Sequence, residues 1–306
     1  MTIPTGVVCP VATPLRDGVV DEFAMRHLLK ALQGRVAGVV AVGSSGAAAL
    51  LPDEVADQAV AIALDACGES LPVYVGVVEA STARALGCVR RRRDLERAAG
   101  ILACGPYFQT VTEHRFLVKH FATIAKQSPV PVVLYNLPAV GYPLPVSVVS
   151  ELSKHPNVSG IKDSYGDVFL FQQYLQSASE DFAVLQGREQ LTAVTALLGG
   201  SGIVSALANI APSLLARTWD ATTRGDVAEA RRLQRSVTSL ATLFDHGGHW
   251  VSALMVALSL LGFGTGSVPA PLPVPDDAAR LAIRIAMEDA PSDSMISPLL
   301  STPGSP

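Results

Sequence analysis

Eight short apolar runs, alternating with helical patterns, are the feature that most constrains the fold of this chain. The runs cover residues 6–11, 36–42, 72–77, 99–104, 130–135, 157–162, 182–186 and 202–205. Most are too apolar for a sheet with one face in water, which predicts parallel strands buried on both faces. Eight β/α units favour an α/β fold of the (β/α)₈ TIM barrel type, although periodicity alone leaves an open sheet as the alternative.

Helical patterns fill the segments between these runs and continue beyond them. One pattern with i, i+3, i+4, i+7 spacing consists of Met25, Leu28, Leu29 and Leu32. Strand patterns stop at about residue 211. We therefore predict a barrel over 1–210, C-terminal helices packed on it over 211–290, and a disordered tail rich in Pro and Ser over 291–306.

Charge and composition argue against several kinds of partner. The net charge of −4, with acidic and basic residues interspersed, predicts no surface for nucleic acid or an anionic membrane. The mean hydropathy is high, at +0.36, but the apolar segment "WVSALMVALSLLG" is too short to span a bilayer. The four cysteines show no C-x-x-C spacing. In a chain without a signal peptide they indicate reduced thiols in a cytoplasmic protein, with no disulfide and no zinc.

Lys162 is the most informative residue for chemistry, because side chains at the carboxyl ends of barrel strands face the active-site mouth. It ends a buried run. The remaining lysines, which fall on or at the ends of predicted surface helices, are Lys30, Lys119, Lys126 and Lys154. In an enclosed, weakly polar pocket a lysine loses its proton more readily, so its amine can attack a ketone and form a Schiff base. The alternative is a strand-end lysine whose ammonium reaches water.

Tyr135 and the "GSSG" loop are the other candidate groups. Tyr135 ends the neighbouring run, where its phenol could move protons that a covalently engaged lysine cannot; alternatively it is a core tyrosine. Ser44 and Ser45 lie between two glycines, in a loop that can turn N–H groups and hydroxyls toward a small carboxylate. Taken alone, that loop is an ordinary turn.

Nucleotide and metal sites are not expected. The chain contains neither the G-x-x-x-x-G-K-[ST] of a P-loop nor G-x-G-x-x-G. Its six histidines are scattered, and the one close pair, in "HGGH", has no carboxylate or thiol nearby. We therefore predict neither a cofactor nor a metal.

Five motifs in order resemble those of one known family. They are "GSSGA", "GPYFQ", "YNLP", "GIKDS" and "GIVSALANIAP". Together they are similar to the motifs of the dihydrodipicolinate synthase and N-acetylneuraminate lyase family, the pyruvate-type class I aldolases. The resemblance runs from "GVVCPVATPL" to "VPAPLPVPDDAARL" and so covers nearly the whole chain.

This resemblance implies a homotetrameric (β/α)₈ barrel that joins or cleaves a 2-oxo acid, usually pyruvate, and an aldehyde. It implies that Lys162 forms the Schiff base and that Tyr135 relays protons. Ser44 and Ser45 would bind the carboxylate, with Val204 near the substrate. No cofactor is implied.

Three positions depart from the family pattern. Val140 stands where dihydrodipicolinate synthases carry an arginine that binds a substrate carboxylate, and a valine cannot form that ion pair. Ala47 replaces a glutamate. Phe108, or Gln109 after a one-residue shift, replaces a tyrosine that in synthases reaches a neighbouring subunit's site.

The loop after the seventh run suggests what the distal part of the substrate is. It reads Gly187-Arg188-Glu189 instead of an acidic pair. Our hypothesis is that Arg188 and Glu189 bind the substrate, with Arg188 on a distal anionic group; the alternative is an outward-facing Arg188.

These observations predict a Schiff-base lyase that cleaves a 2-keto-3-deoxy sugar acid or a hydroxy-oxo acid. The alternatives are a dihydrodipicolinate synthase-like or a dehydratase or hydratase-aldolase activity, and a non-catalytic relative that binds 2-oxo acids. The expected assembly is a homotetramer or a homodimer.

Overall fold

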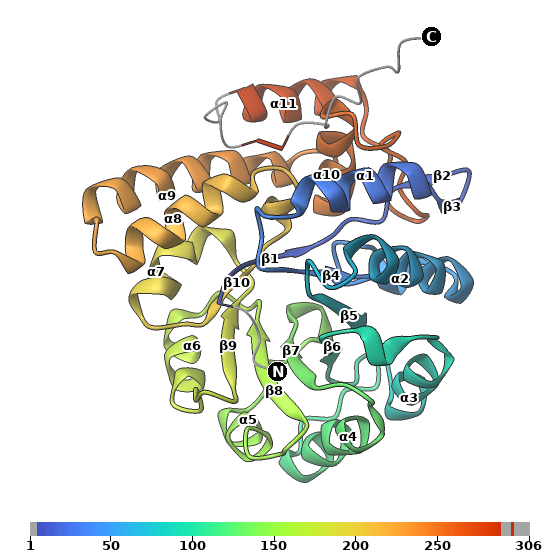
Figure 1. Ribbon diagram of the computed structural model, residues 1–306, viewed down its shortest axis with the longest axis vertical. Helices are drawn as coiled ribbons and strands as arrows, with labels where there is room; N and C mark the ends of the chain where they lie inside the picture. Colours follow the sequence, from blue (N-terminus) through green and yellow to red (C-terminus); the bar gives the residue numbers. More distant parts are fainter. Residues whose placement is uncertain (1–4, 289–294, 297–306) are drawn as a thin grey trace.

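The computed structural model describes residues 5–288 and 295–296, which contain a closed barrel of eight parallel strands (Figure 1). The strands are β1 (Gly6–Pro10), β4 (Gly38–Ala41), β5 (Val73–Val77), β6 (Gly100–Cys104), β7 (Val132–Asn136), β8 (Val158–Asp163), β9 (Ala183–Gln186) and β10 (Gly202–Val204). They pair in the order β1-β10-β9-β8-β7-β6-β5-β4, and β4 closes on β1. The predicted TIM barrel is confirmed.

Each predicted run corresponds to one strand, and two of the strands extend one residue beyond the predicted run. β7 ends at Asn136 and β8 at Asp163, so Tyr135 and Lys162 are the penultimate residues of their strands. The extension arises because both polar residues are buried and take part in the parallel ladder.

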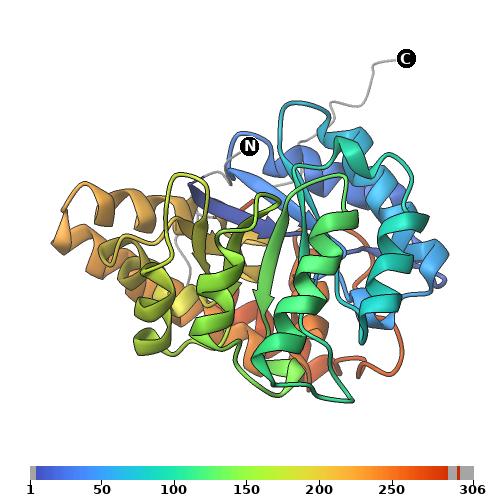
Figure 2. The same cartoon turned by 90° about the horizontal axis from the view of Figure 1, so that it is seen from below.

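Helices alternate with the strands and enclose them, as Figures 1 and 2 show. They are α1 (Glu22–Leu32), α2 (Asp53–Cys67), α3 (Thr82–Arg91), α4 (His114–Gln127), α5 (Val146–Leu152), α6 (Val168–Leu175), α7 (Thr192–Leu197) and α8 (Pro212–Thr223). The predicted stripe of α1 is buried, and Asp21 caps this helix by accepting from the Ala24 N–H. A small hairpin of β2 (Leu15–Arg16) and β3 (Val19–Val20) precedes α1 and was not predicted.

Three further helices lie together on one side of the barrel, at the top of Figure 1. They are α9 (Val227–Ala241), α10 (Trp250–Leu260) and α11 (Asp277–Glu288). A short 3₁₀ helix at Thr242–Asp245 joins α9 to the segment before α10. Of the tail predicted to be disordered, only 295–296 fall within the described residues.

Apolar side chains fill the inside of the barrel. Residues from seven strands surround a remaining space of only about 10 Å³; they are Val8, Val40, Tyr74, Leu102, Val133, Leu185 and Val204. The barrel is therefore a packed core, and open space lies at its mouth. All four cysteines are free and buried. Within the described ranges, no helix has both the length and the apolar character needed to cross a bilayer.

The close approach of β5 to the loop after β4 predicts an intolerant glycine. A Cβ atom at Gly76 would overlap the carbonyl oxygen of Val42. Gly76→Ala should lower the free energy of unfolding by about 1–3 kcal/mol, because the backbone must shift. Gly87→Ala is the matched control, since a Cβ there meets nothing within 4 Å and alanine favours the helix. Urea unfolding followed by circular dichroism measures both; equal stability of the two variants would contradict this account of the packing.

Candidate active site

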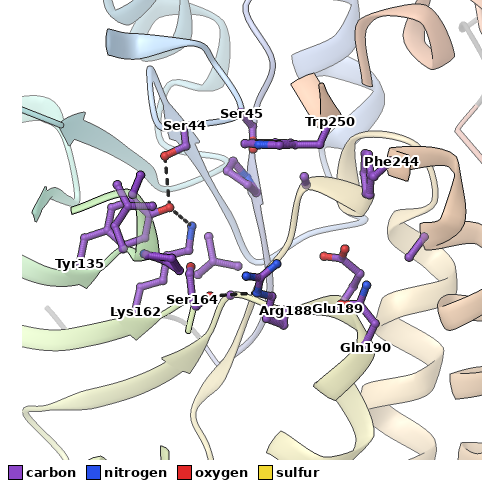
Figure 3. Close-up of a pocket in the computed structure, with 18 of the residues that line it drawn as sticks. Ser44, Ser45, Tyr135, Lys162, Ser164, Arg188, Glu189, Gln190, Phe244 and Trp250 are labelled. Carbon is purple, nitrogen blue, oxygen red and sulfur yellow. Dashed lines mark hydrogen bonds between the residues drawn. The ribbon is translucent and has the colours of Figure 1, made fainter. Parts of the chain in front are cut away.

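The register between β7 and β8 brings Tyr135 and Lys162 together at the barrel mouth. The two residues are paired in the parallel ladder, and both side chains point to the inner face. Lys162 Nζ lies 3.2 Å from Tyr135 Oη and 4.3 Å from the centroid of its ring (Figure 3). Both residues are buried, at 5% and 3% exposure. Lys162 therefore does not extend its amino group into bulk water.

Ser44 extends this contact into a chain of three polar groups. Its Oγ lies 3.2 Å from Tyr135 Oη, with either oxygen able to donate. Burial alone would raise the pKa of Tyr135, but the positive charge of Lys162 and hydrogen bonds at the phenol lower it below its ordinary value. The phenol can therefore exchange a proton with the amine on one side and the hydroxyl on the other.

The "GSSG" loop is held by close contacts with the loop after β1. A Cβ atom at Gly46 would lie 3.0 Å from Thr13 Oγ1 and 3.1 Å from the Val11 carbonyl oxygen. Thr13 Oγ1 in turn donates to the Gly46 carbonyl. A side chain at Gly46 would therefore crowd the loop after β1, and Ser44 and Ser45 both line the cavity.

Arg188 and Glu189 form the wall of the cavity away from Tyr135. Arg188 Nε donates to the Ser164 carbonyl oxygen at 2.9 Å, and the guanidinium lies on the cavity side (Figure 3). The Glu189 carboxyl is buried and accepts a hydrogen bond from Ser205 Oγ at 3.0 Å. Burial raises the pKa of Glu189 above its ordinary value, although the Ser205 hydroxyl and two nearby cations act against it. The wall thus presents a cation beside a carboxyl group.

All the residues predicted for the site, including Val204, line one cavity of about 440 Å³. It also contains side chains that the sequence did not indicate: Ser164, Gln190, Phe244, Asp245 and Trp250. Ser164 follows Lys162 by two residues, a spacing that would have identified it. Phe244 and Trp250 come from the C-terminal helices and meet edge to face, with ring centroids 6.4 Å apart. No local pattern marks these two as cavity residues.

The three departures from the family pattern lie outside this cavity. Ala47 and Val140 line a neighbouring, largely apolar cavity of about 370 Å³. The two cavities share four lining residues: Ser44, Leu137, Ala139 and Trp250. Phe108 is 90% exposed, with φ at +70°, in the left-handed region. Within the described part of the chain, no group of three or more His, Cys, Asp or Glu side chains could hold a metal ion.

The lowered pKa of Tyr135 predicts the order in which the phenols ionise. The other five tyrosines have raised pKa values, with burial as the main cause: Tyr74 and Tyr142, each to about 12, and Tyr107, Tyr165 and Tyr174. In an alkaline titration the wild type should form its first phenolate below the ordinary tyrosine pKa of about 10. Tyr135→Phe should lose this step, whereas Tyr165→Phe should keep it. Phenolate absorbance measures the titration, and an unchanged first step in Tyr135→Phe would contradict the assignment.

Comparison with known proteins identifies the family. The model of the dihydrodipicolinate synthetase family matches residues 3–289. The 4-hydroxy-tetrahydrodipicolinate synthase of Syntrophus aciditrophicus is 28% identical over 287 residues, which cover 93% of this chain and 97% of that protein. The enzyme of the same name from Methanospirillum hungatei is 33% identical over 258 residues, covering 84% and 86%.

Solved structures agree with this match. Dihydrodipicolinate synthase from Bacteroides thetaiotaomicron superposes with a TM-score of 0.87 at 27% identity, covering 94% of this chain and 100% of that one. YagE of Escherichia coli K12, solved in complex with pyruvate, gives 0.86 at 26% identity, covering 93% and 97%. The family resemblance of the motifs and the predicted enzyme class, a carbon–carbon lyase, are confirmed. The chain belongs to the dihydrodipicolinate synthetase family.

Proposed function

We propose that this protein joins or cleaves a 2-oxo acid, pyruvate, and an aldehyde through a Schiff base on Lys162. The observation that carries the proposal is the buried amine of Lys162, which lies 3.2 Å from the Tyr135 phenol and lines the cavity. An amine in this setting is suited to attack a ketone, and the phenol is within reach of the oxygen that must leave. Membership of the family supports the same chemistry.

The proposed reaction begins with the carboxylate of the 2-oxo acid at Ser44 and Ser45. The Lys162 amine adds to the C2 carbonyl, and Tyr135 gives a proton to the carbinolamine oxygen, which leaves as water. In the cleavage direction the Tyr135 phenolate takes the proton of the C4 hydroxyl, the C3–C4 bond breaks with its electron pair passing to the iminium, and the aldehyde departs, leaving an enamine on Lys162. Protonation at C3 and hydrolysis then release pyruvate and the free amine.

The distal wall supports a polar substrate, a 2-keto-3-deoxy sugar acid or a hydroxy-oxo acid. Arg188 offers a cation and Glu189 a carboxyl group on the same side of the cavity. A synthase reaction like that named for the relatives is the second candidate, because Val140 provides no guanidinium for a substrate carboxylate. A purely binding role is less favoured, since the amine, phenol and hydroxyl lie together in one cavity.

Assembly and compartment are also proposals. We propose a homodimer or homotetramer in the cytoplasm, in keeping with the exposed Phe108 and the four free cysteines. One structural neighbour, with a TM-score of 0.88 at 22% identity, is described as a monomeric dihydrodipicolinate synthase variant, so the fold is compatible with more than one assembly.

Reductive trapping tests the Schiff base. Pyruvate with borohydride should add one reduced adduct to wild-type protein, located by peptide mass mapping on Lys162 among the five lysines. Lys162→Arg should not be trapped, because a guanidinium forms no stable imine, whereas the control Lys154→Arg should react as wild type. Labelling of another lysine, or no labelling with any 2-oxo acid, would overturn the proposal.

Cleavage of two substrates tests the role of Arg188. Arg188→Ala should slow cleavage of 4-hydroxy-2-oxoglutarate about 10- to 100-fold, the loss expected when a charged hydrogen bond is removed. Cleavage of 4-hydroxy-2-oxopentanoate, whose distal group is neutral, should change much less. Arg115→Ala, at an exposed site, is the control. Equal losses for both substrates would remove the proposed anion site.

A further inference from the structure

A row of buried polar side chains lies behind the mouth, on the outer face of the barrel. Asn136, Asp163 and Gln186 end three adjacent strands and are paired in the sheet. We call these three residues the outer row. Strand residues alternate between faces, so the row points away from the cavity that Tyr135 and Lys162 line. Its exposures are 0%, 0% and 1%, and buried polar groups of this kind persist when they satisfy hydrogen bonds.

Asn136 holds the loop that follows β7. Its Oδ1 accepts from the Leu144 N–H at 2.8 Å, which fixes the far end of the loop. Its Nδ2 donates to Asp163 Oδ1 at 2.7 Å and to Tyr174 Oη at 3.2 Å. Tyr174 in turn donates to the Leu144 carbonyl oxygen. This loop supplies Leu137 and the two residues after it to the cavity.

Asp163 connects the two ends of the row. Its Oδ1 accepts from Asn136 and from the Tyr165 N–H at 3.2 Å, which fixes the turn that carries Ser164. Its Oδ2 has no hydrogen-bond partner within 3.5 Å among the described residues. Burial raises the pKa of Asp163, and the Tyr165 N–H, the Asn136 amide and the Gln186 side chain offset part of this effect.

Gln186 holds the distal wall. Its Oε1 accepts from the N–H groups of Gly187 and Arg188, at 2.8 and 3.1 Å. Together with a bond from the Gly187 N–H to the Asp163 carbonyl oxygen at 2.6 Å, these bonds hold the turn that carries Arg188 and Glu189. A Cβ atom at Gly187 would overlap the Ser164 hydroxyl and lie 3.0 Å from the Ser164 Cβ, so a side chain there would displace Ser164. The wall and the Ser164 turn are therefore packed against each other.

We propose that the outer row consists of positioning residues, which hold the distal wall and the Lys162–Tyr135 pair in one arrangement. None of the three lines the cavity, so each acts through the loop that it bonds. Gln186 positions Arg188 and Glu189, and Asp163 positions the strand ends that carry the amine and the phenol. The inference rests on the proposed function for its effect on catalysis, but its structural part is measurable without any substrate.

Gln186→Met tests the positioning of the distal wall separately from that of the Lys162–Tyr135 pair. Methionine is similar in size to glutamine and has no amide oxygen. Exchange with deuterium at residues 187–188 should become faster through the Arg188 amide, whereas the Gly187 amide keeps its bond to the Asp163 carbonyl oxygen. Preference for 4-hydroxy-2-oxoglutarate over 4-hydroxy-2-oxopentanoate should fall about tenfold, since a displaced wall loses its charged contact. Reductive trapping by pyruvate should fall less than this preference, because the Gln186 Oε1 that methionine lacks accepts from residues 187 and 188, not from the strand residues Lys162 and Tyr135.

Two variants of Asp163 test its role: asparagine keeps a side-chain oxygen that can accept hydrogen bonds, and leucine does not. Asp163→Asn keeps an oxygen for Asn136 and the Tyr165 N–H, so trapping should remain within about threefold of wild type. Asp163→Leu removes both bonds, and trapping should fall about 10- to 100-fold as the amine and phenol lose their alignment.

Asn157→Leu is the matched control for a general loss of stability. Asn157 precedes β8 at the other end of the strand, and its Nδ2 donates to the Ala125 carbonyl at 2.7 Å. It should lower the melting temperature but change neither the substrate preference nor exchange at 187–188.

The outcomes separate the two proposals. Wild-type exchange at 187–188 in Gln186→Met would overturn the positioning role, as would the same pattern of changes in Asn157→Leu. If wild-type protein is not trapped by pyruvate, the proposed function fails, and exchange at 187–188 alone decides whether the row positions the wall.

Discussion

The register between β7 and β8 is the constraint on which the site depends. Parallel pairing sets Tyr135 beside Lys162 on the inner face, and the 3.2 Å contact between phenol and amine follows from that pairing. A slip of one residue would turn one of these side chains outward, because successive strand residues point to opposite faces. It would also turn the apolar side chains on each face of that strand to the opposite face. Core packing therefore fixes the geometry of the proposed chemistry.

The same alternation gives the rim of the barrel two layers. Facing inward, Tyr135 and Lys162 meet the cavity, where a substrate can reach them. Facing outward, Asn136 and Asp163 are buried between the strands and the surrounding helices and loops, where they bond to backbone groups. The groups that would react are thus separate from the groups that hold the loops. The C-terminal helical region adds two aromatic side chains, Phe244 and Trp250, to the lining of the cavity.

Much of the barrel and half of the site could be predicted, because local sequence patterns indicate them. Apolar runs of strand length mark each of the eight strands, and the residue types near their ends marked Tyr135 and Lys162. The ends of β7 and β8 were placed one residue early, because Asn136 and Asp163 look like loop residues until their buried partners are known. The two-residue strands of the β2–β3 hairpin are too short to leave a periodic pattern.

The sequence by itself determined where the eight strands lie along the chain, the one lysine that ends such an apolar run, and the family. Only the tertiary structure decided that Arg188 faces the cavity, that Ser44 reaches a phenol 91 residues further along the chain, and that Trp250 lines the same cavity. The physical reason is the separation along the chain of the residues that interact. Strand and helix patterns arise from neighbouring residues, whereas the direction of a side chain across a cavity depends on how distant helices and loops pack around a closed barrel.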